Sequence, residues 1–152
     1  MKSRSKVLIG LGLITLVSGL WAWLSGPLWL EQFNERQIDV RETFQAQGRL
    51  FGQSHDQQAC LTQTLNDFSG CIGFECTLQQ DYFLKACLAE AAPSQGFCDG
   101  VPAYRLKLTE DDKSWAKYAC WEGDIRGEGC RLLLRQQQYE CSGGIAADAP
   151  AQ

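Results

Sequence analysis

The sequence predicts an all-α protein in which a single N-terminal transmembrane helix and a helical stalk precede a small disulfide-stapled bundle of antiparallel helical hairpins. Three observations lead to this prediction. An uncharged stretch follows three basic residues, apolar residues recur at helical spacing further along, and all eight cysteines lie between residues 60 and 141. We expect a cytoplasmic basic segment (1–6), a membrane anchor (7–30), a stalk (31–52), a disulfide-rich domain (53–141) and a disordered tail (142–152).

The predicted anchor, residues 7–30, contains no charged side chain. At about 1.5 Å per residue this stretch spans roughly 36 Å as a helix, which is enough for a bilayer core of about 30 Å. Lys2, Arg4 and Lys6 precede it, and basic residues at this position favour a cytoplasmic N-terminus. A cleaved signal peptide shows the same pattern. The apolar stretch continues well past the passable cleavage site at Gly19, so we expect an anchor that is not cleaved.

The predicted stalk, residues 31–52, is polar and contains no proline. Phe33, Val40, Phe44 and Phe51 recur at helical intervals and mark one face of a helix. Polar residues interrupt this face, which makes it a weak coiled-coil seam. Two interpretations remain open. The face packs on the protein's own domain, or Phe33, Val40 and Phe44 bind a second copy or a partner helix.

Four further helices are expected in the disulfide-rich domain. The first covers about residues 54–68. The second runs to about residue 91, with Thr77 as its N-cap and Gln80 completing a capping box. The third begins at Thr109, and the three acidic residues that follow favour the positive end of a helix dipole. The last carries three consecutive leucines (132–134) and runs toward residue 141.

The first four cysteines have a regular spacing. Cys60 and Cys71 are 11 residues apart, and so are Cys76 and Cys87. Eleven residues turn through roughly 1100°, close to three full turns, so cysteines at this spacing share one helix face. The four positions are also symmetric about residues 73–74. This symmetry predicts an antiparallel helical hairpin with two nested disulfides, Cys60–Cys87 and Cys71–Cys76.

The other four cysteines lie further along the chain. Cys120 and Cys130 can bracket a second turn, which leaves Cys98 with Cys141 by elimination, although eight cysteines can be paired in many other ways. Zinc is disfavoured because the sequence has no C-x-x-C pair and one histidine, His55. A dense group of cysteines, even in number and following a hydrophobic segment in the chain, therefore indicates an oxidising compartment.

The charge balance restricts the ligand classes. Beyond residue 24 the chain has 11 Lys and Arg against 18 Asp and Glu, a formal charge of −7. Such a domain repels phosphate backbones, so we expect no binding of nucleic acid. The sequence shows no catalytic constellation, no cofactor motif and no metal-ligand spacing. The acidic run 110–112 fits helix capping better than calcium binding, because no D-x-D-x-D-G loop is present.

These observations predict a non-enzymatic protein-interaction module, anchored in a bacterial inner membrane with its domain in the periplasm. It would act as an accessory or assembly subunit of an envelope complex. A location in an endomembrane or in a mitochondrial inner membrane is the alternative that composition leaves open. Trp115 and Trp121 belong either to the core or to a partner-binding surface. Two alternatives are an inhibitor or immunity-type protein against an exported enzyme and a thiol–disulfide redox factor that uses Cys71 and Cys76.

Overall fold

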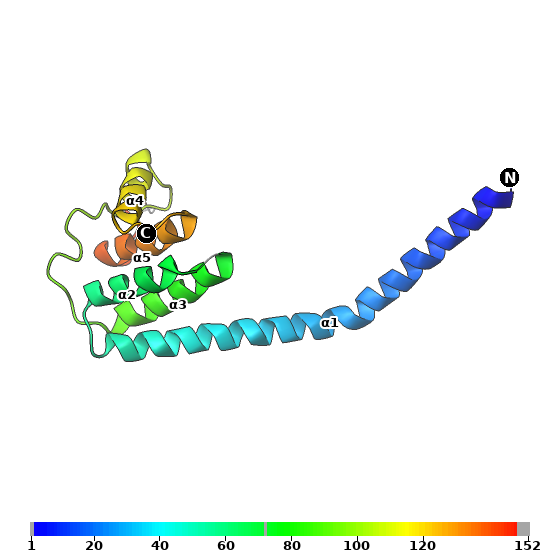
Figure 1. Ribbon diagram of the computed structural model, residues 1–152, viewed down its shortest axis with the longest axis horizontal. Coiled ribbons are helices and arrows are strands. Elements are labelled where there is room, and N and C mark those ends of the chain that lie inside the picture. Colours follow the sequence, from blue (N-terminus) through cyan, green and yellow to red (C-terminus); the bar gives the residue numbers. More distant parts are fainter. Residues whose placement is uncertain (1, 72, 149–152) are drawn as a thin grey trace. The chain divides into compact units, whose positions relative to one another are not determined.

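The computed structural model describes residues 2–71 and 73–148. The described part is all-helical (Figure 1), as predicted, with the elements α1 (Lys2–Gly52), α2 (Gln57–Ser69), α3 (Phe74–Glu90), α4 (Glu110–Glu122) and α5 (Glu128–Cys141). The chain divides into two compact units, residues 1–40 and 41–152.

Residues 2–40 of the first unit belong to α1, whose apolar side chains between Leu11 and Leu24 are exposed. No single helix in the described part of the chain is long and apolar enough to cross a membrane. Two segments that meet at a bend, Gly10–Leu24 and Trp29–Gly52, have the length and composition of a membrane span only when they are taken together. Pro27 is one of the four residues between the two segments in the sequence, and a proline favours a helix bend because it has no backbone N–H to donate. The single transmembrane helix predicted over residues 7–30 is therefore not confirmed.

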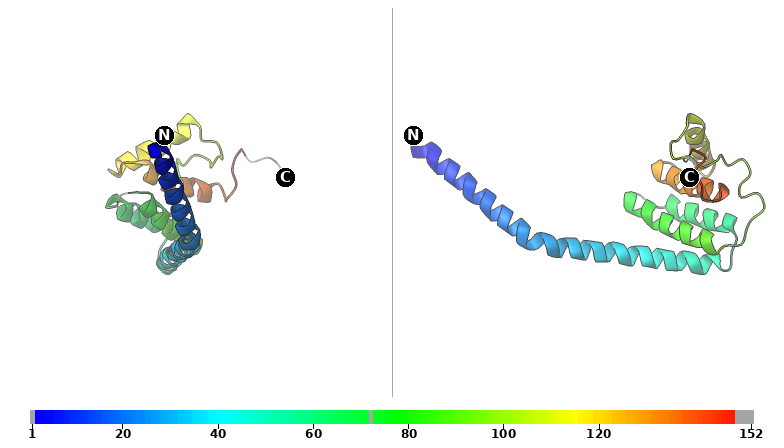
Figure 2. Two further views of the ribbon diagram at one scale, coloured as in Figure 1. Left: turned by 90° about the vertical axis from the view of Figure 1, so that its right-hand side faces the viewer. Right: turned by 180° about the vertical axis from the view of Figure 1, so that it is seen from behind.

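In the second unit, α2 and α3 form the antiparallel hairpin that the cysteine symmetry predicts. Disulfides join Cys60 with Cys87 and Cys71 with Cys76. The first links the far ends of the two helices, and the second lies at the turn between them. Both predicted pairs are confirmed. The link after α3, residues 91–109, passes the ends of the helices before it reaches α4 (Figure 2).

The remaining disulfides, Cys98–Cys141 and Cys120–Cys130, also match the predicted pairing. The four disulfides therefore fall into two separate blocks of sequence, residues 60–87 and 98–141, and none connects one block to the other. The second block differs from the expected antiparallel hairpin, because α4 crosses α5 at a steep angle (Figure 1).

The C-terminal end of α1 packs closely on α3. Gly48 and Gly52 are one helical turn apart, and a Cβ at either position would collide with the backbone carbonyl of Phe83 or Cys87. Phe44 and Phe51 on the same helix pack against the buried core of the domain. For these two residues the structure supports the interpretation that the stalk face packs on its own domain. The two glycines explain how the helix backbones approach so closely.

Helix α5 is central to the domain and packs against α2, α3 and α4. Leu133 and Leu134 on its inner face are buried, as are Leu84 of α3 and Phe97 of the link. Gly129 lies against the Phe68 ring and the Thr77 hydroxyl, where a Cβ would not fit. This contact brings the first turn of α5 next to the first turn of α3.

The helix caps agree with the sequence prediction at one position and differ at another. Thr109 caps α4 and forms a reciprocal capping box with Asp112. Thr77, in contrast, is not an N-cap: α3 already begins at Phe74, after Gly73 with a φ of 108°. The Thr77 hydroxyl instead donates a hydrogen bond of 3.2 Å to the Gly73 carbonyl, inside the helix.

Residues 142–148 are tied to the link before α4. The Ser142 hydroxyl accepts a hydrogen bond from the Tyr104 backbone N–H, and the Asp148 carboxylate accepts from the N–H groups of Leu106 and Lys107. These hydrogen bonds lower the pKa of the Asp148 carboxyl, and the one from Lys107 has a larger effect than the one from Leu106. These contacts order a segment that the sequence predicted to be a disordered tail. Residues 149–152 lie outside the described part.

Candidate functional site: a groove between α3 and α5

A groove of about 650 Å³ lies between α3 and α5 in the second unit. One end is apolar and is lined by Phe74, Leu78 and Leu132, of which Phe74 is 73% and Leu132 51% exposed. Tyr104 and Tyr139 line the groove further along, with ring centroids 5.3 Å apart in an edge-to-face arrangement. Large apolar side chains that gather at an open groove are typical of a surface that contacts another molecule.

An arginine side chain lies against an aromatic ring in this groove. The Arg135 guanidinium lies 5.0 Å from the centre of the Tyr104 ring and donates a hydrogen bond of 3.0 Å to the Arg105 carbonyl. Both contacts hold Arg135 in place and leave further N–H groups for a ligand. Tyrosine and arginine are enriched among the residues that contribute most to protein–protein binding. The groove therefore contains two of the residue types that are enriched at protein interfaces.

The charged residues that line the groove balance, with Lys85 and Arg135 against Asp81 and Glu140. Lys85 and Asp81 of α3 form an ion pair of 2.7 Å, and Gln136 donates a hydrogen bond of 2.9 Å to Glu140 on α5. An exposed ion pair such as Lys85–Asp81 contributes little to stability, so it is easily exchanged for contacts with a partner.

The local fold explains why Phe74 is presented to solvent. Gly73 adopts a left-handed φ, which starts α3 abruptly and makes Phe74 its first residue. The disulfide between Cys71 and Cys76 closes the turn around it. The backbone beneath Phe74 is thereby constrained, which reduces the conformational entropy that binding would remove.

The predicted partner-binding residues are distributed differently. Phe44 and Trp115 pack against the core, whereas Phe33 and Trp121 are 44% and 53% exposed. Trp121 forms a second aromatic surface, with the Tyr118 ring 5.8 Å away and the Lys117 ammonium 4.4 Å from its ring centre.

Val40, the remaining predicted partner-binding residue, is half-buried on α1.

The groove residues were not identified from the sequence. Phe74 and Leu132 are 58 positions apart in the chain, and only the packing of α5 on α3 brings these two segments together.

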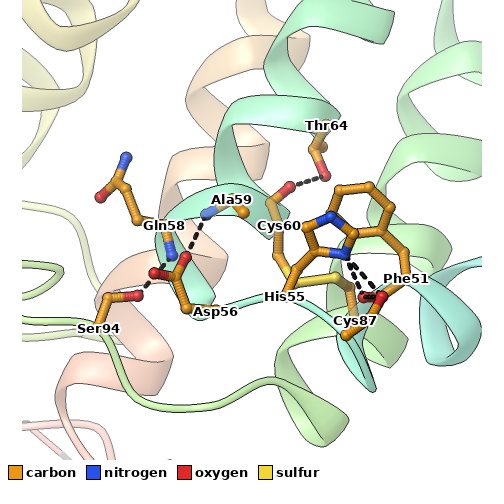
Figure 3. The surroundings of a disulfide bond; sticks show 10 residues. Phe51, His55, Asp56, Gln58, Ala59, Cys60, Thr64, Cys87 and Ser94 are labelled. Carbon is orange, nitrogen blue, oxygen red and sulfur yellow. Dashed lines mark hydrogen bonds between the residues drawn. A yellow bond between two sulfur atoms is a disulfide. The ribbon is translucent and has the colours of Figure 1, made fainter.

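Ser54, His55 and Asp56 are adjacent in the sequence, but the Asp56 carboxylate points toward the start of α2 and not toward the His55 ring (Figure 3). The His55 Nδ1 atom lies 2.8 Å from the Phe51 carbonyl and 2.9 Å from the Ser54 hydroxyl. The Asp56 carboxylate accepts a hydrogen bond from the Ala59 N–H and caps α2 instead. A serine nucleophile needs a histidine that is itself oriented by the carboxylate, and Asp56 is committed to the cap.

No family model, no curated protein and no solved structure matches the chain.

Proposed function

We propose that the protein is a membrane-anchored, non-enzymatic interaction module whose domain lies on the outer side of a bacterial inner membrane. In this role it serves as an accessory or assembly subunit of an envelope complex. The observation that carries the proposal is the groove between α3 and α5, with Phe74 and Leu132 exposed beside Arg135 and Tyr104. The groove would receive an apolar segment of a protein partner.

Site-specific photocrosslinking in intact membranes tests the proposal. A photoreactive phenylalanine analogue at Phe74 should crosslink to one defined partner. The same analogue at Asn66, an exposed position of α2 outside the groove, should not. Placed at Trp121, it distinguishes the groove from the aromatic surface of α4. A partner trapped equally at Phe74 and Asn66, or at Trp121 alone, would contradict the assignment of the groove.

The substitution Phe74→Ala separates binding from folding. Because Phe74 is 73% exposed, its truncation should change stability by no more than about 0.5 kcal/mol. Truncating an aromatic anchor of an interface weakens binding by about 2 kcal/mol or more, which corresponds to roughly thirtyfold. Retention of the partner after detergent extraction, measured beside the unfolding midpoint of the same variant, gives both quantities.

A thiol titration distinguishes this function from thiol–disulfide exchange. All eight cysteines are in disulfides, and Cys60, Cys87 and Cys130 are fully buried. The denatured protein should therefore contain no free thiol, and the native protein should not reduce insulin. Catalytic turnover with two labelled thiols at Cys71 and Cys76 would favour the redox function instead.

A further inference from the structure

Helices α3 and α5 follow the same pattern. Each begins after a glycine with a left-handed φ, 108° at Gly73 and 113° at Gly127. In both helices a cysteine lies three residues after this glycine, and a second cysteine lies 11 residues further on. In both blocks of four cysteines the inner two form one disulfide and the outer two form another. Positions in α3 and α5 that are 54 residues apart, such as Cys76 and Cys130, are therefore equivalent.

The groove is lined by equivalent positions of these two helices. Residues 80–86 and 134–140 have the same order of burial: buried, half-buried twice, buried twice, exposed and half-buried. Three pairs of equivalent residues line the groove: Leu78 and Leu132, Asp81 and Arg135, and Lys85 and Tyr139. Figure 1 and Figure 2 show α3 and α5 side by side and running in the same direction. The groove therefore follows the shared direction of two equivalent helices.

The groove is long enough for about three turns of a further helix. On α3 the lining residues run from Phe74 to Lys85, and 11 residues at about 1.5 Å each span about 16 Å. The apolar residues Phe74, Leu78 and Leu132 are nearest to the helix starts, and the charged residues of the lining follow later in both helices. An occupant that matches the groove is therefore elongated and has its apolar residues at one end.

An extended segment would leave backbone groups without hydrogen-bond partners in this groove. Side chains form its walls, and the described part of the domain has no strand whose edge could pair with the segment. A helix needs no such partners, because its backbone groups bond to one another. Proline-rich segments dock in aromatic-lined grooves, but the Tyr104 and Tyr139 rings meet edge to face at 5.3 Å and leave no slot between them. These features favour a helical occupant.

Two half-buried charges of the lining, Arg135 and Glu140, belong to none of the ion pairs in the described part of the chain. The Arg135 guanidinium contacts the Arg105 carbonyl and the Tyr104 ring, which are both neutral. The Glu140 carboxylate accepts a hydrogen bond from the neutral Gln136 amide. Opposite charges of an occupant would be screened by water less at these positions than on the open surface. The occupant that fits best carries an acidic residue beside Arg135 and a basic residue beside Glu140.

We infer that the groove binds an amphipathic helix of the protein partner. From the starts of α3 and α5 toward their ends, the bound face of this helix presents apolar, then acidic, then basic residues. The apolar residues pack on Phe74, Leu78 and Leu132, and the charged residues pair with Arg135 and Glu140. The inference rests on the proposed function and adds the kind of segment that the groove receives.

Photocrosslinking in intact membranes from two positions, Phe74 and Lys85, measures the rise per residue of the bound segment. The photoreactive phenylalanine analogue is placed at one position at a time, and the labelled residues of the partner are mapped by mass spectrometry. A helix places the two labelled residues about 11 positions apart on one face, because 16 Å is about three turns. The analogue at Tyr139, which is equivalent to Lys85, should label the same turn as the analogue at Lys85. An extended or proline-rich segment would place the labels about five positions apart, and that result would overturn the inference.

Substitution of Arg135 tests the order of charges. Arg135→Gln keeps a donor for the Arg105 carbonyl but removes the charge, so capture at Phe74 should fall severalfold at low salt. Arg126→Gln, which removes an exposed arginine outside the groove, is the matched control and should leave capture unchanged. Unfolding midpoints of both variants separate a loss of binding from a loss of folding. Equal capture by the two variants would overturn the assignment of an acidic residue beside Arg135.

The outcomes of the crosslinking separate this inference from the proposed function. Labels about 11 positions apart on one face of a single partner support both. A single partner captured at Phe74 with labels about five positions apart refutes only this inference. Failure to capture any defined partner at Phe74 refutes the proposed function as well.

Discussion

Removal of the Cys60–Cys87 disulfide should destabilise the domain more than removal of Cys71–Cys76. Each pair is replaced by two alanines, so that no unpaired thiol remains. The two disulfides close loops of 27 and 5 residues. Loss of the entropic constraint on the unfolded chain then costs about 3.5 and about 2 kcal/mol respectively. Cys60 and Cys87 are fully buried, whereas Cys71 is partly exposed, so lost packing adds to the first value.

Urea unfolding of the full-length protein in detergent, followed by near-ultraviolet circular dichroism, measures both free energies. The comparison uses values extrapolated to water, because an unfolded chain without the disulfide exposes more surface and raises the denaturant slope. Replacement of Cys120 and Cys130, which close a loop of 10 residues, provides an intermediate case at about 2.7 kcal/mol. An equal or larger loss for the Cys71–Cys76 variant would refute the reasoning from loop length.

Four further outcomes are expected. Gly48→Ala should destabilise the domain by about 1–3 kcal/mol, because its Cβ would meet the backbone of α3. Gly70→Ala is the control and should have little effect, because the space around Gly70 is open. Similar unfolding midpoints for the two variants would contradict the close packing of α1 on α3. Thr109→Ala should cost about 1 kcal/mol through loss of the capping box of α4, measured by thermal unfolding. The lowered pKa of Asp148 means that its stabilising contribution is present above the unfolded value of about 3.9 and is lost as the pH falls through the folded pKa. The protection factors of the amides of residues 106–107, corrected for the intrinsic pH dependence of exchange, should therefore fall on acidification, with no such step in Asp148→Asn. N-terminal sequencing of protein extracted from membranes should yield an uncleaved chain, and a mature chain that starts at Leu20 would show that the segment is a signal peptide.

The pairing of the first four cysteines was accessible from the sequence because spacing and turn residues agree. Their symmetric positions require an antiparallel hairpin, and Gly73 supplies the break at its centre. The cap at Thr109 could be predicted because threonine is a good N-cap and the three acidic residues after it favour the positive end of a helix dipole; the reciprocal capping box with Asp112 was not predicted. Features that are determined by residues close together in the sequence could therefore be predicted from the sequence.

Features that depend on packing could not be read in the same way. The capping-box pattern at Thr77 competes with the glycine before it, and the helix begins at the glycine. Gln80, expected to complete that box, is buried, and its Oε1 atom has no partner among the described residues. The groove depends on Gly129 in the first turn of α5, which lets this helix approach α3, and the sequence gives no indication of which helix will lie against that glycine.

The separation of the disulfides into two blocks has a consequence for oxidative folding. In the proposed topology the N-terminus stays on the inner side and the residues next to the anchor are exported first, so residues 60–87 reach the oxidising side before residues 98–141. The first four cysteines can complete their pairing while the last four are still sequestered. The number of alternatives is then small, since each set of four cysteines allows about three pairings. The order of synthesis would thus suppress bonds between the blocks, and the last disulfide to close would be Cys98–Cys141, which awaits the C-terminal end of α5.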